Sequence, residues 1–244
     1  MRLVVTGGAG YLGSEVCRQA VEAGHDVVAL QFRRPPPFGR PLPSDIRGPF
    51  EIDADVVVHT AYVQTDTDTI VRGTRNVAAA AASSGARLIH LSTDLVFDGE
   101  HAPYSEEDEP RPVSDYGLAK LESESFVAKN GLVVRTSLLY GKAGPQEALA
   151  ARGDVVFHND EIRCPTHVGD LAAALIELAE RDDVTGILHV AGPDAVSRLE
   201  LARLLGARDP RGAPTPPGRA RNVALDSSRA ATLLSTRIRG LLHS

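Results

Sequence analysis

Short runs of apolar, β-branched residues alternate with longer helical patterns in the first third of the chain, and this alternation constrains the fold most. The strand-like runs are RLVVT, DVVAL, ADVVVHT and RLIHLS, and the helical patterns between them include YLGSEVCRQAVEAG and TIVRGTRNVAAAAASSG. Such alternation is typical of βαβ units, so it predicts a parallel sheet with helices on both faces. The strand-like runs are apolar throughout because helices cover both of their sides.

The pattern continues through a helix near SDYGLAKLESESFVAKNG and a strand LVVRTSLLY, which makes five or six strands up to Tyr140. We therefore predict an α/β fold, a Rossmann-like doubly wound parallel sheet with a small C-terminal substrate cap. Residues 1–140 form the predicted core, which contains the glycine-rich segment TGGAGYLG that is typical of NAD(P)-binding domains. Residues 141–244 form the predicted cap, with segments that return to the core, and they include VGDLAAALIELAERD, GILHVAG and SRLELARLLGARD. Residues 32–50 are too rich in proline for a regular helix, so we expect an extended surface loop there.

Composition excludes several classes of protein. The 244 residues carry a formal net charge of −6, which disfavours nucleic acid as a partner. No apolar run is long enough to cross a membrane, which requires about 18 residues. Cys17 and Cys164 lie far apart, with neither a CxxC pair nor a Cys/His ligand set around them, so we expect no metal site and a reducing, cytoplasmic location.

The segment VVTGGAGYLG lies directly between the first strand and the first helix. It contains Gly8-x-Gly10-x-x-Gly13, and in a looser spacing Gly7-x-x-Gly10-x-x-Gly13. Glycines at such a turn let the backbone approach a pyrophosphate, and the N-terminus of the following helix attracts anions. A glycine match alone also fits an ordinary tight turn, but the strand before it and the helix after it favour a dinucleotide site.

The end of the second predicted strand bears on the choice between NAD and NADP. An acidic residue there binds the ribose 2′-hydroxyl, whereas arginine suits a 2′-phosphate. The sequence reads Gln31-Phe32-Arg33-Arg34 with no carboxylate after the strand, which favours NADPH and leaves NADH open. The alternative is a pair of solvated arginines in a proline-rich loop.

Tyr116 and Lys120 lie four residues apart in a predicted helix, so both side chains lie on one face. A tyrosine hydroxyl has a pKa near 10, and a neighbouring ammonium favours its phenolate. The strand before this helix ends in Ser92-Thr93, at the sheet edge where open α/β sheets bind ligands. The order of glycine loop, strand-end hydroxyl and Tyr/Lys pair predicts proton transfer to a carbonyl oxygen.

These residues resemble the extended short-chain dehydrogenase/reductase superfamily, and within it the dTDP-4-dehydrorhamnose reductase-like, sugar-nucleotide-binding group. The resemblance covers most of the chain, in the order TGGAGYLG, DADVVVHTAY, GTRNVA, STDLVFDG, PYSEEDEPRPVSDYGLAK, VVRTSLLYG, HVGDLAAAL and NVALDSSRA. It implies NADPH-dependent reduction of a nucleotide-activated keto-sugar or a related polar ketone, with Thr93, Tyr116 and Lys120 as the catalytic set. It also implies a small-molecule substrate and assembly as a homodimer, and no membrane partner is expected.

The resemblance further implies which residues hold the cofactor. They are Gly7, Gly10, Tyr11, Leu12 and Gly13 of the loop, with Arg33, Arg34, Asp45, Ile46, Ala61, Tyr62, Tyr116 and Lys120. Asn76 is expected either to support a proton-relay water or to be an ordinary polar residue of a helix.

The substrate half departs from the family pattern. Leu95 and Leu138 stand where the family usually has aromatic residues that face the sugar, and only about twenty residues separate Gly141 from Arg163. Aromatic contacts contribute roughly 0.5–1.5 kcal/mol each, so we expect weak affinity for dTDP-sugars. Arg163 either grips a substrate diphosphate or forms an ion pair with Asp160 or Asp170.

Two histidines and a cysteine have structural interpretations, and two further functions stay open. His59 and His90 are expected in the core, and Cys164 is expected to be a buried, inert thiol. A non-catalytic NADP-binding regulatory subunit is the second function we consider. An NAD-dependent sugar epimerase or dehydratase is the third, although Asp94 lacks the partner carboxylate that dehydration needs.

Overall fold

The computed structural model describes residues 1–242, which divide into two compact units. The first unit comprises Met1–Ser92, Ala119–Val134 and Ala172–Leu188. The second comprises Thr93–Leu118, Arg135–Leu171 and the chain from His189 onward. The chain therefore passes several times between the units, so each unit is built from segments that are distant in sequence.

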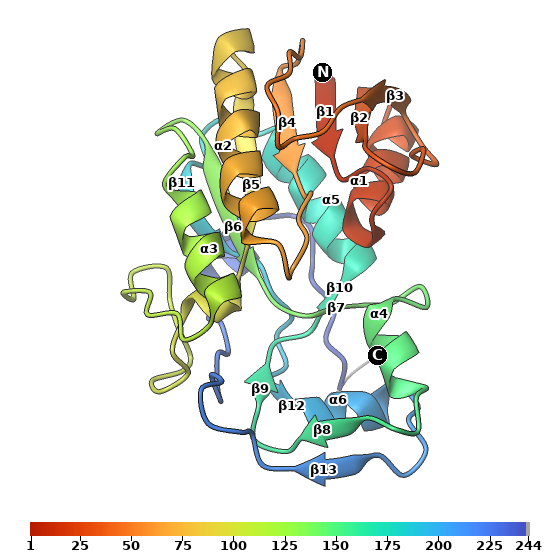
Figure 1. The fold of residues 1–244 in the computed structure, drawn as a ribbon, viewed down its shortest axis with the longest axis vertical. Helices are drawn as coiled ribbons and strands as arrows, with labels where there is room; N and C mark the ends of the chain where they lie inside the picture. The colour runs from red at the N-terminus through yellow and green to blue at the C-terminus, as the bar shows by residue number, and fades with distance from the viewer. Residues whose placement is uncertain (243–244) are drawn as a thin grey trace. The chain divides into compact units, whose positions relative to one another are not determined.

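A seven-stranded sheet runs through the first unit in the order β11-β6-β5-β4-β1-β2-β3 (Figure 1). Its strands are β1 (Arg2–Thr6), β2 (Asp26–Gln31), β3 (Arg40–Pro43), β4 (Val56–His59), β5 (Arg87–Thr93), β6 (Leu132–Thr136) and β11 (Gly186–His189). The pairs β1–β2, β1–β4, β2–β3 and β4–β5 are parallel. The predicted Rossmann-like sheet is confirmed.

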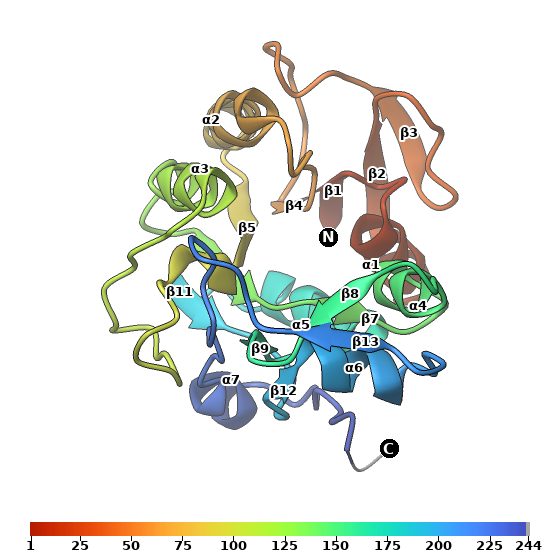
Figure 2. The ribbon, with the colours of Figure 1, turned by 60° about the horizontal axis from the view of Figure 1, so that its bottom comes forward.

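Helices cover both faces of this sheet, as Figure 2 shows for α2 and α3 on one face and α1 and α5 on the other. Their bounds are α1 (Tyr11–Glu22), α2 (Thr67–Ser84), α3 (Asp115–Glu124) and α5 (Val168–Ala179). Local chemistry fixes the ends of α2: the Asp66 side chain accepts a hydrogen bond from the Thr69 N–H, and Gly85 ends the helix at a φ of 72°. Buried residues of α2 and of the strands form one apolar core, with Val4, Val28, Val57, Val77 and Leu88 among its members.

The second unit consists of short elements. They are η1 (Asp94–Val96), β7 (Leu139–Tyr140), α4 (Pro145–Ala150), β8 (Val156–His158), β9 (Ile162–Arg163), β10 (Thr166–His167), β12 (Val196–Ser197), α6 (Arg198–Leu204), β13 (Arg211–Ala213) and α7 (Ser228–Leu233). Three two-stranded pairs, β7–β10, β9–β12 and β8–β13, tie these segments together. A small core of Ala150, Phe157, Leu199 and Ala202 joins α4, β8 and α6.

Two sequence expectations need correction. Residues 40–43 do not stay in a surface loop, because they pair in parallel with β2 as the edge strand β3. The predicted strand 132–140 divides into β6, which joins the main sheet, and β7, which pairs with β10. The strand predicted near residue 186 is β11 of the main sheet. The division of function between 1–140 and 141–244 stays a prediction.

No helix within residues 1–242 is both long enough and apolar enough to cross a membrane.

Candidate active site

Three glycines shape the turn between β1 and α1. Gly7 has a φ of 71°, and its carbonyl oxygen accepts a hydrogen bond from the Gly10 N–H at 2.7 Å. A Cβ at Gly13 would lie 2.2 Å from the same carbonyl oxygen, so only glycine fits there. Both readings of the motif share Gly10 and Gly13, and the backbone contacts show that Gly7 completes the turn.

This turn fits the pyrophosphate of a dinucleotide. Helix α1 starts at Tyr11, and Leu12 is its second residue. The N-cap residue, Gly10, has no side chain that could bond the first N–H groups of the helix. The N-terminal end of a helix carries a partial positive charge, and a glycine turn lets an anion come close to it. A Cβ at Gly10 would lie 3.0 Å from the Gly7 carbonyl oxygen, so the glycines keep the turn tight at the start of the helix.

Arg33 and Arg34 lie in the exposed loop after β2, within the same unit as the glycine turn. The Arg34 guanidinium approaches the Ala9 carbonyl oxygen at 3.4 Å. The Arg33 guanidinium lies 5.1 Å from the centre of the Phe32 ring. Arg34 therefore reaches the glycine turn, and its role toward a 2′-phosphate stays a prediction.

The segment that contains Asp45 and Ile46 is fixed by neighbours in the first unit. Asp45 forms an ion pair with Arg47 at 2.7 Å, and the Arg47 guanidinium keeps the pKa of that carboxyl below its usual value. Ile46 is buried, and a Cβ at Gly73 would lie 2.8 Å from its Cδ1. The Asn76 amide donates to the Ile46 carbonyl at 2.9 Å, so Asn76 ties α2 to this segment, and its role in a proton relay stays a prediction.

Lys120 lies in α3 and is almost fully buried in the first unit. Its Nζ donates to the Leu91 carbonyl oxygen at 2.5 Å and lies 3.3 Å from His90 Nε2. Burial lowers the pKa of Lys120 from 10.5 to about 7, and Glu124 opposes this shift. The ammonium also lies 6.0 Å from the ring centre of Tyr62, which follows β4 with Ala61.

His59 and His90 form the buried floor beneath Lys120. Their rings stack with centres 5.1 Å apart, and His59 also contacts Thr6 Oγ1 at 2.6 Å. Burial lowers the pKa of His59 to about 3 and that of His90 well below its usual value, with the Lys120 charge adding to both shifts. Both rings are therefore neutral near pH 7, which confirms the expectation that they belong to the core.

Tyr116 stands in the first turn of α3, one turn before Lys120 on the same helix. The Ser114 hydroxyl accepts a hydrogen bond from the Gly117 N–H at 3.1 Å and so caps the helix. A Cβ at Gly117 would lie 2.2 Å from the Leu95 carbonyl oxygen, which allows only glycine at this contact. Gly117 thus lets the start of α3 pack against the turn that follows Thr93, within the second unit.

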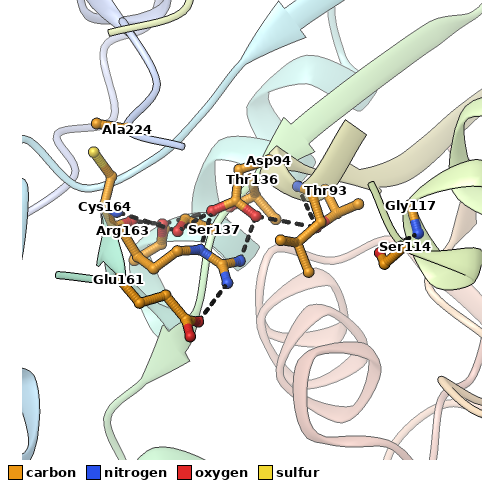
Figure 3. A network of polar contacts seen from close by, with 12 residues as sticks. Thr93, Asp94, Ser114, Gly117, Thr136, Ser137, Glu161, Arg163, Cys164 and Ala224 are labelled. Atoms are coloured by element: carbon orange, nitrogen blue, oxygen red, sulfur yellow. Dashed lines mark hydrogen bonds and ion pairs between the residues drawn. The ribbon is translucent and has the colours of Figure 1, made fainter. Parts of the chain in front are cut away.

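The Thr93 hydroxyl donates a hydrogen bond to Asp94 Oδ1 at 3.1 Å and accepts one from the Leu95 N–H at 3.2 Å (Figure 3). Asp94 is fully buried and forms a bidentate ion pair with Arg163, whose Nε donates to Asp94 Oδ2 at 2.7 Å. The expected ion-pair partners of Arg163, Asp160 and Asp170, are therefore wrong. Asp160 instead accepts a hydrogen bond from the Thr215 N–H, and Asp170 pairs with Arg239.

Leu95 and Leu138 are both half-buried in the second unit. The Leu138 carbonyl accepts a hydrogen bond from the Thr166 N–H at 2.7 Å, next to the pair β7–β10. These contacts position the two backbones, and the roles of both side chains toward a substrate stay predictions. Cys164 is buried as expected, and burial raises the pKa of its thiol to about 11.

Sequence reasoning did not predict the contacts that four residues of this region make. His90, Asp94 and Gly117 lie inside motifs that the sequence had already marked, but neither the contact of Gly117 with Leu95 nor the packing under Lys120 is visible in a linear pattern. Ser137 donates to Asp94 Oδ2 at 2.5 Å across 43 residues of sequence. No cluster of metal-ligating side chains occurs within residues 1–242.

Comparison with known proteins decides the family. The model of the RmlD substrate binding domain matches residues 1–237. The chain belongs to the RmlD substrate binding domain family. A dTDP-4-dehydrorhamnose reductase of Mycobacterium tuberculosis is 36% identical over 233 residues, which cover 83% of this chain and 73% of that protein.

Two further similarities matter for function. Methionine adenosyltransferase 2 subunit beta of Rattus norvegicus is 33% identical over 233 residues, covering 82% of this chain and 70% of that protein. The crystal structure of a hypothetical dTDP-4-dehydrorhamnose reductase from Sulfolobus tokodaii matches with a TM-score of 0.84 and 29% identity, covering 98% of this chain and 97% of that one. The resemblance read from the motifs is confirmed, and with it the class of NAD(P)-dependent oxidoreductases.

Proposed function

We propose that this RmlD-family chain is an NADPH-dependent reductase that acts on the ketone of a nucleotide-activated keto-sugar or a related polar ketone. The observation that carries the proposal is the placement of Tyr116 and Lys120 one turn apart on α3, with the start of that helix packed through Gly117 against the turn after Thr93. The relative from Mycobacterium tuberculosis supports the sugar-nucleotide class of substrate.

The proposed division of labour follows from the side chains. Bound NADPH would supply the hydride, and the glycine turn with Arg34 would hold its phosphates. Tyr116 donates the proton to the carbonyl oxygen, and the Thr93 hydroxyl orients that oxygen. Lys120, on the same face of α3, favours the phenolate that Tyr116 leaves behind because an opposite charge stabilises the ionised form.

Changing Tyr116 to phenylalanine removes the proton donor and keeps the ring. Loss of a general acid lowers the rate on the order of 10²–10⁴-fold. We expect this loss in kcat for reduction of a nucleotide-linked 4-keto-sugar, with the dissociation constant for NADPH unchanged. A Phe variant that turns over as fast as the parent, with NADPH bound equally well, would show that Tyr116 is not the donor.

The substrate series sharpens the proposal. Because leucines stand at positions 95 and 138, we expect weak affinity, and therefore a high KM, for dTDP-4-dehydrorhamnose. A panel of dTDP-, UDP- and GDP-linked keto-sugars and free polar ketones tests this expectation. Rapid turnover of dTDP-4-dehydrorhamnose at micromolar concentration would remove this distinction. A cytoplasmic location and a homodimer are part of the proposal and are tested separately, by fractionation and by light scattering.

A regulatory subunit is the second candidate, because the rat relative is a subunit of an adenosyltransferase. Calorimetry and turnover separate the two: tight NADPH binding with no reduction of any ketone in the panel favours the subunit. The dehydratase alternative is weakened by the surroundings of Asp94. Its carboxylate oxygens are engaged by Arg163, Ser137 and Thr93, so the group is not placed to move a proton.

A further inference from the structure

The carboxylate of Asp94 lies at the centre of a buried polar network in the second unit (Figure 3). Arg163 donates from Nε to Oδ2 at 2.7 Å and from its terminal NH2 group to Oδ1. Thr93 donates to Oδ1 at 3.1 Å, and Ser137 donates to Oδ2 at 2.5 Å. An ionised carboxylate offers about four acceptor positions, and the four donors use all of them.

The Thr93 hydroxyl has a single proton, and that proton points to Asp94. Its oxygen meanwhile accepts a hydrogen bond from the Leu95 N–H. In this arrangement Thr93 can accept a further hydrogen bond but cannot donate one. To orient a substrate carbonyl, which only accepts hydrogen bonds, the hydroxyl must turn away from Asp94.

When the Thr93 hydroxyl rotates away, Arg163 remains as a hydrogen-bond donor to Asp94 Oδ1. Thr93 and Arg163 donate to the same oxygen, so a donor stays on Oδ1 when Thr93 leaves. A buried carboxylate that loses its donors is unfavourable, and Arg163 removes that obstacle. Burial alone would lower the pKa of the Arg163 guanidinium, but the Asp94 carboxylate outweighs burial and raises it, so the donor stays charged.

Arg163 is itself held in place from its other side. Glu161 Oε1 lies 3.7 Å from its NH1 group, and Glu161 in turn contacts Arg219 at 3.0 Å and His158 at 2.7 Å. The guanidinium therefore has carboxylates on both sides. None of these contacts involves Thr93.

We infer that Arg163 is a positioning residue, which keeps Asp94 satisfied while the Thr93 hydroxyl turns from the carboxylate to the substrate carbonyl. The inference rests on the proposed reductase function, in which Thr93 contacts the carbonyl oxygen. Arg163 acts through Asp94 and makes no contact with the reacting atoms. It is therefore predicted to affect kcat through Thr93 and to leave cofactor binding unchanged.

The first test replaces Arg163 by lysine, which keeps the charge but cannot bond both carboxylate oxygens in the planar, bidentate geometry. Arg239→Lys is the matched control, because Arg239 also bonds a carboxylate, that of Asp170, through Nε at 2.8 Å and NH2 at 2.6 Å. We expect Arg163→Lys to lower kcat roughly tenfold, less than the 10²–10³-fold typical for loss of a whole donor to the reacting oxygen. KM and the NADPH dissociation constant should not change, and Arg239→Lys should match the parent.

A second background separates positioning from general packing. Thr93→Val has nearly the same shape as the parent and removes the hydroxyl. If Arg163 acts through that hydroxyl, Arg163→Lys lowers kcat in the parent but has no further effect in the Thr93→Val protein. An equal loss in both backgrounds, or parental kcat in Arg163→Lys, overturns the inference.

A measurement without turnover keeps the inference distinguishable from the reductase proposal. In a protein with labelled threonine methyl groups, Arg163→Lys should shift the Thr93 signal and leave that of Thr60, which bonds the Thr6 carbonyl in the other unit, unmoved. An unmoved Thr93 signal contradicts the inference even in an active enzyme. A shifted signal in a protein that reduces no ketone contradicts the proposed function and leaves the network intact.

Discussion

Lys120 in the first unit and Arg163 in the second are both buried cations, and their surroundings hold them in opposite ways. Lys120 in the first unit is surrounded by neutral histidine rings and a backbone carbonyl, and burial lowers its pKa to about 7. Arg163 in the second unit is bonded to a carboxylate through two donors, and its pKa is raised. One cation can thus exchange its proton near neutral pH, whereas the other is a fixed charge.

This difference matches the separate tasks that we propose for the two cations. A reductase needs a group whose charge responds to the proton on Tyr116, and Lys120 occupies the same helix as Tyr116. It also needs a rigid frame for the residue that orients the substrate, and Arg163 supplies a frame to Thr93 through Asp94. Arginine suits the second task because its guanidinium stays protonated and bonds carboxylates in a plane.

The largest expected effect comes from breaking the fixed pair. Arg163→Met leaves the fully buried Asp94 carboxylate without its cation, which typically costs about 3–5 kcal/mol of stability. Urea unfolding followed by circular dichroism measures this loss. As the matched case, Lys120→Met removes a buried cation without leaving such a carboxylate and should cost much less at pH 7; equal losses for both variants would abolish the distinction between the two sites.

A smaller effect is the pH dependence that Lys120 imposes. Because its pKa is about 7 in the folded chain and near 10.5 when exposed, the unfolded chain binds more protons between these values, so stability rises with pH there. At about 1.4 kcal/mol per pKa unit, the parent should gain about 2 kcal/mol relative to Lys120→Met between pH 7 and pH 9. Parallel stability curves for the two proteins over this range would mean that the ammonium is not depressed.

The smallest effect concerns the cofactor and sharpens the role of the first unit. Arg34→Ser should weaken NADPH binding about tenfold and leave NADH binding unchanged, because only NADPH carries the 2′-phosphate. Calorimetry with both nucleotides measures the change. Arg40→Ser removes an arginine of β3 and serves as the control; if it has the same effect, the general positive charge of the loop, and not Arg34, sets the preference.

Much of the first unit could be predicted from the sequence because its signals are local. The alternation of apolar runs and helical patterns marks β1, β2, β4, β5 and the helices between them, and Gly7, Gly10 and Gly13 mark the turn. The edge strand β3 escaped prediction because two of its four residues are prolines, which usually argue against a strand and are tolerated at an edge.

The second unit was harder to predict because its contacts join distant residues. The pair of Asp94 with Arg163 spans 69 positions, and an arginine in a short strand has several acidic neighbours in sequence that are equally plausible partners. In the structure Arg163 pairs with Asp94. Asp160 accepts a hydrogen bond from Thr215, and Asp170 pairs with Arg239. The YxxxK spacing was visible in the sequence, whereas the requirement for glycine at position 117 depends on the Leu95 carbonyl that lies against it.

The most direct test of the proposed reductase activity follows the hydride from NADPH to the product. NADPH deuterated at the transferable C4 position is incubated with the protein and a nucleotide-linked 4-keto-sugar, and the product is analysed by mass spectrometry. The proposed reductase should form a product one mass unit heavier than that formed with ordinary NADPH, and Tyr116→Phe should form that product far more slowly. NADPH that binds tightly but transfers no deuterium to any ketone of the panel would contradict the reductase and favour a regulatory subunit.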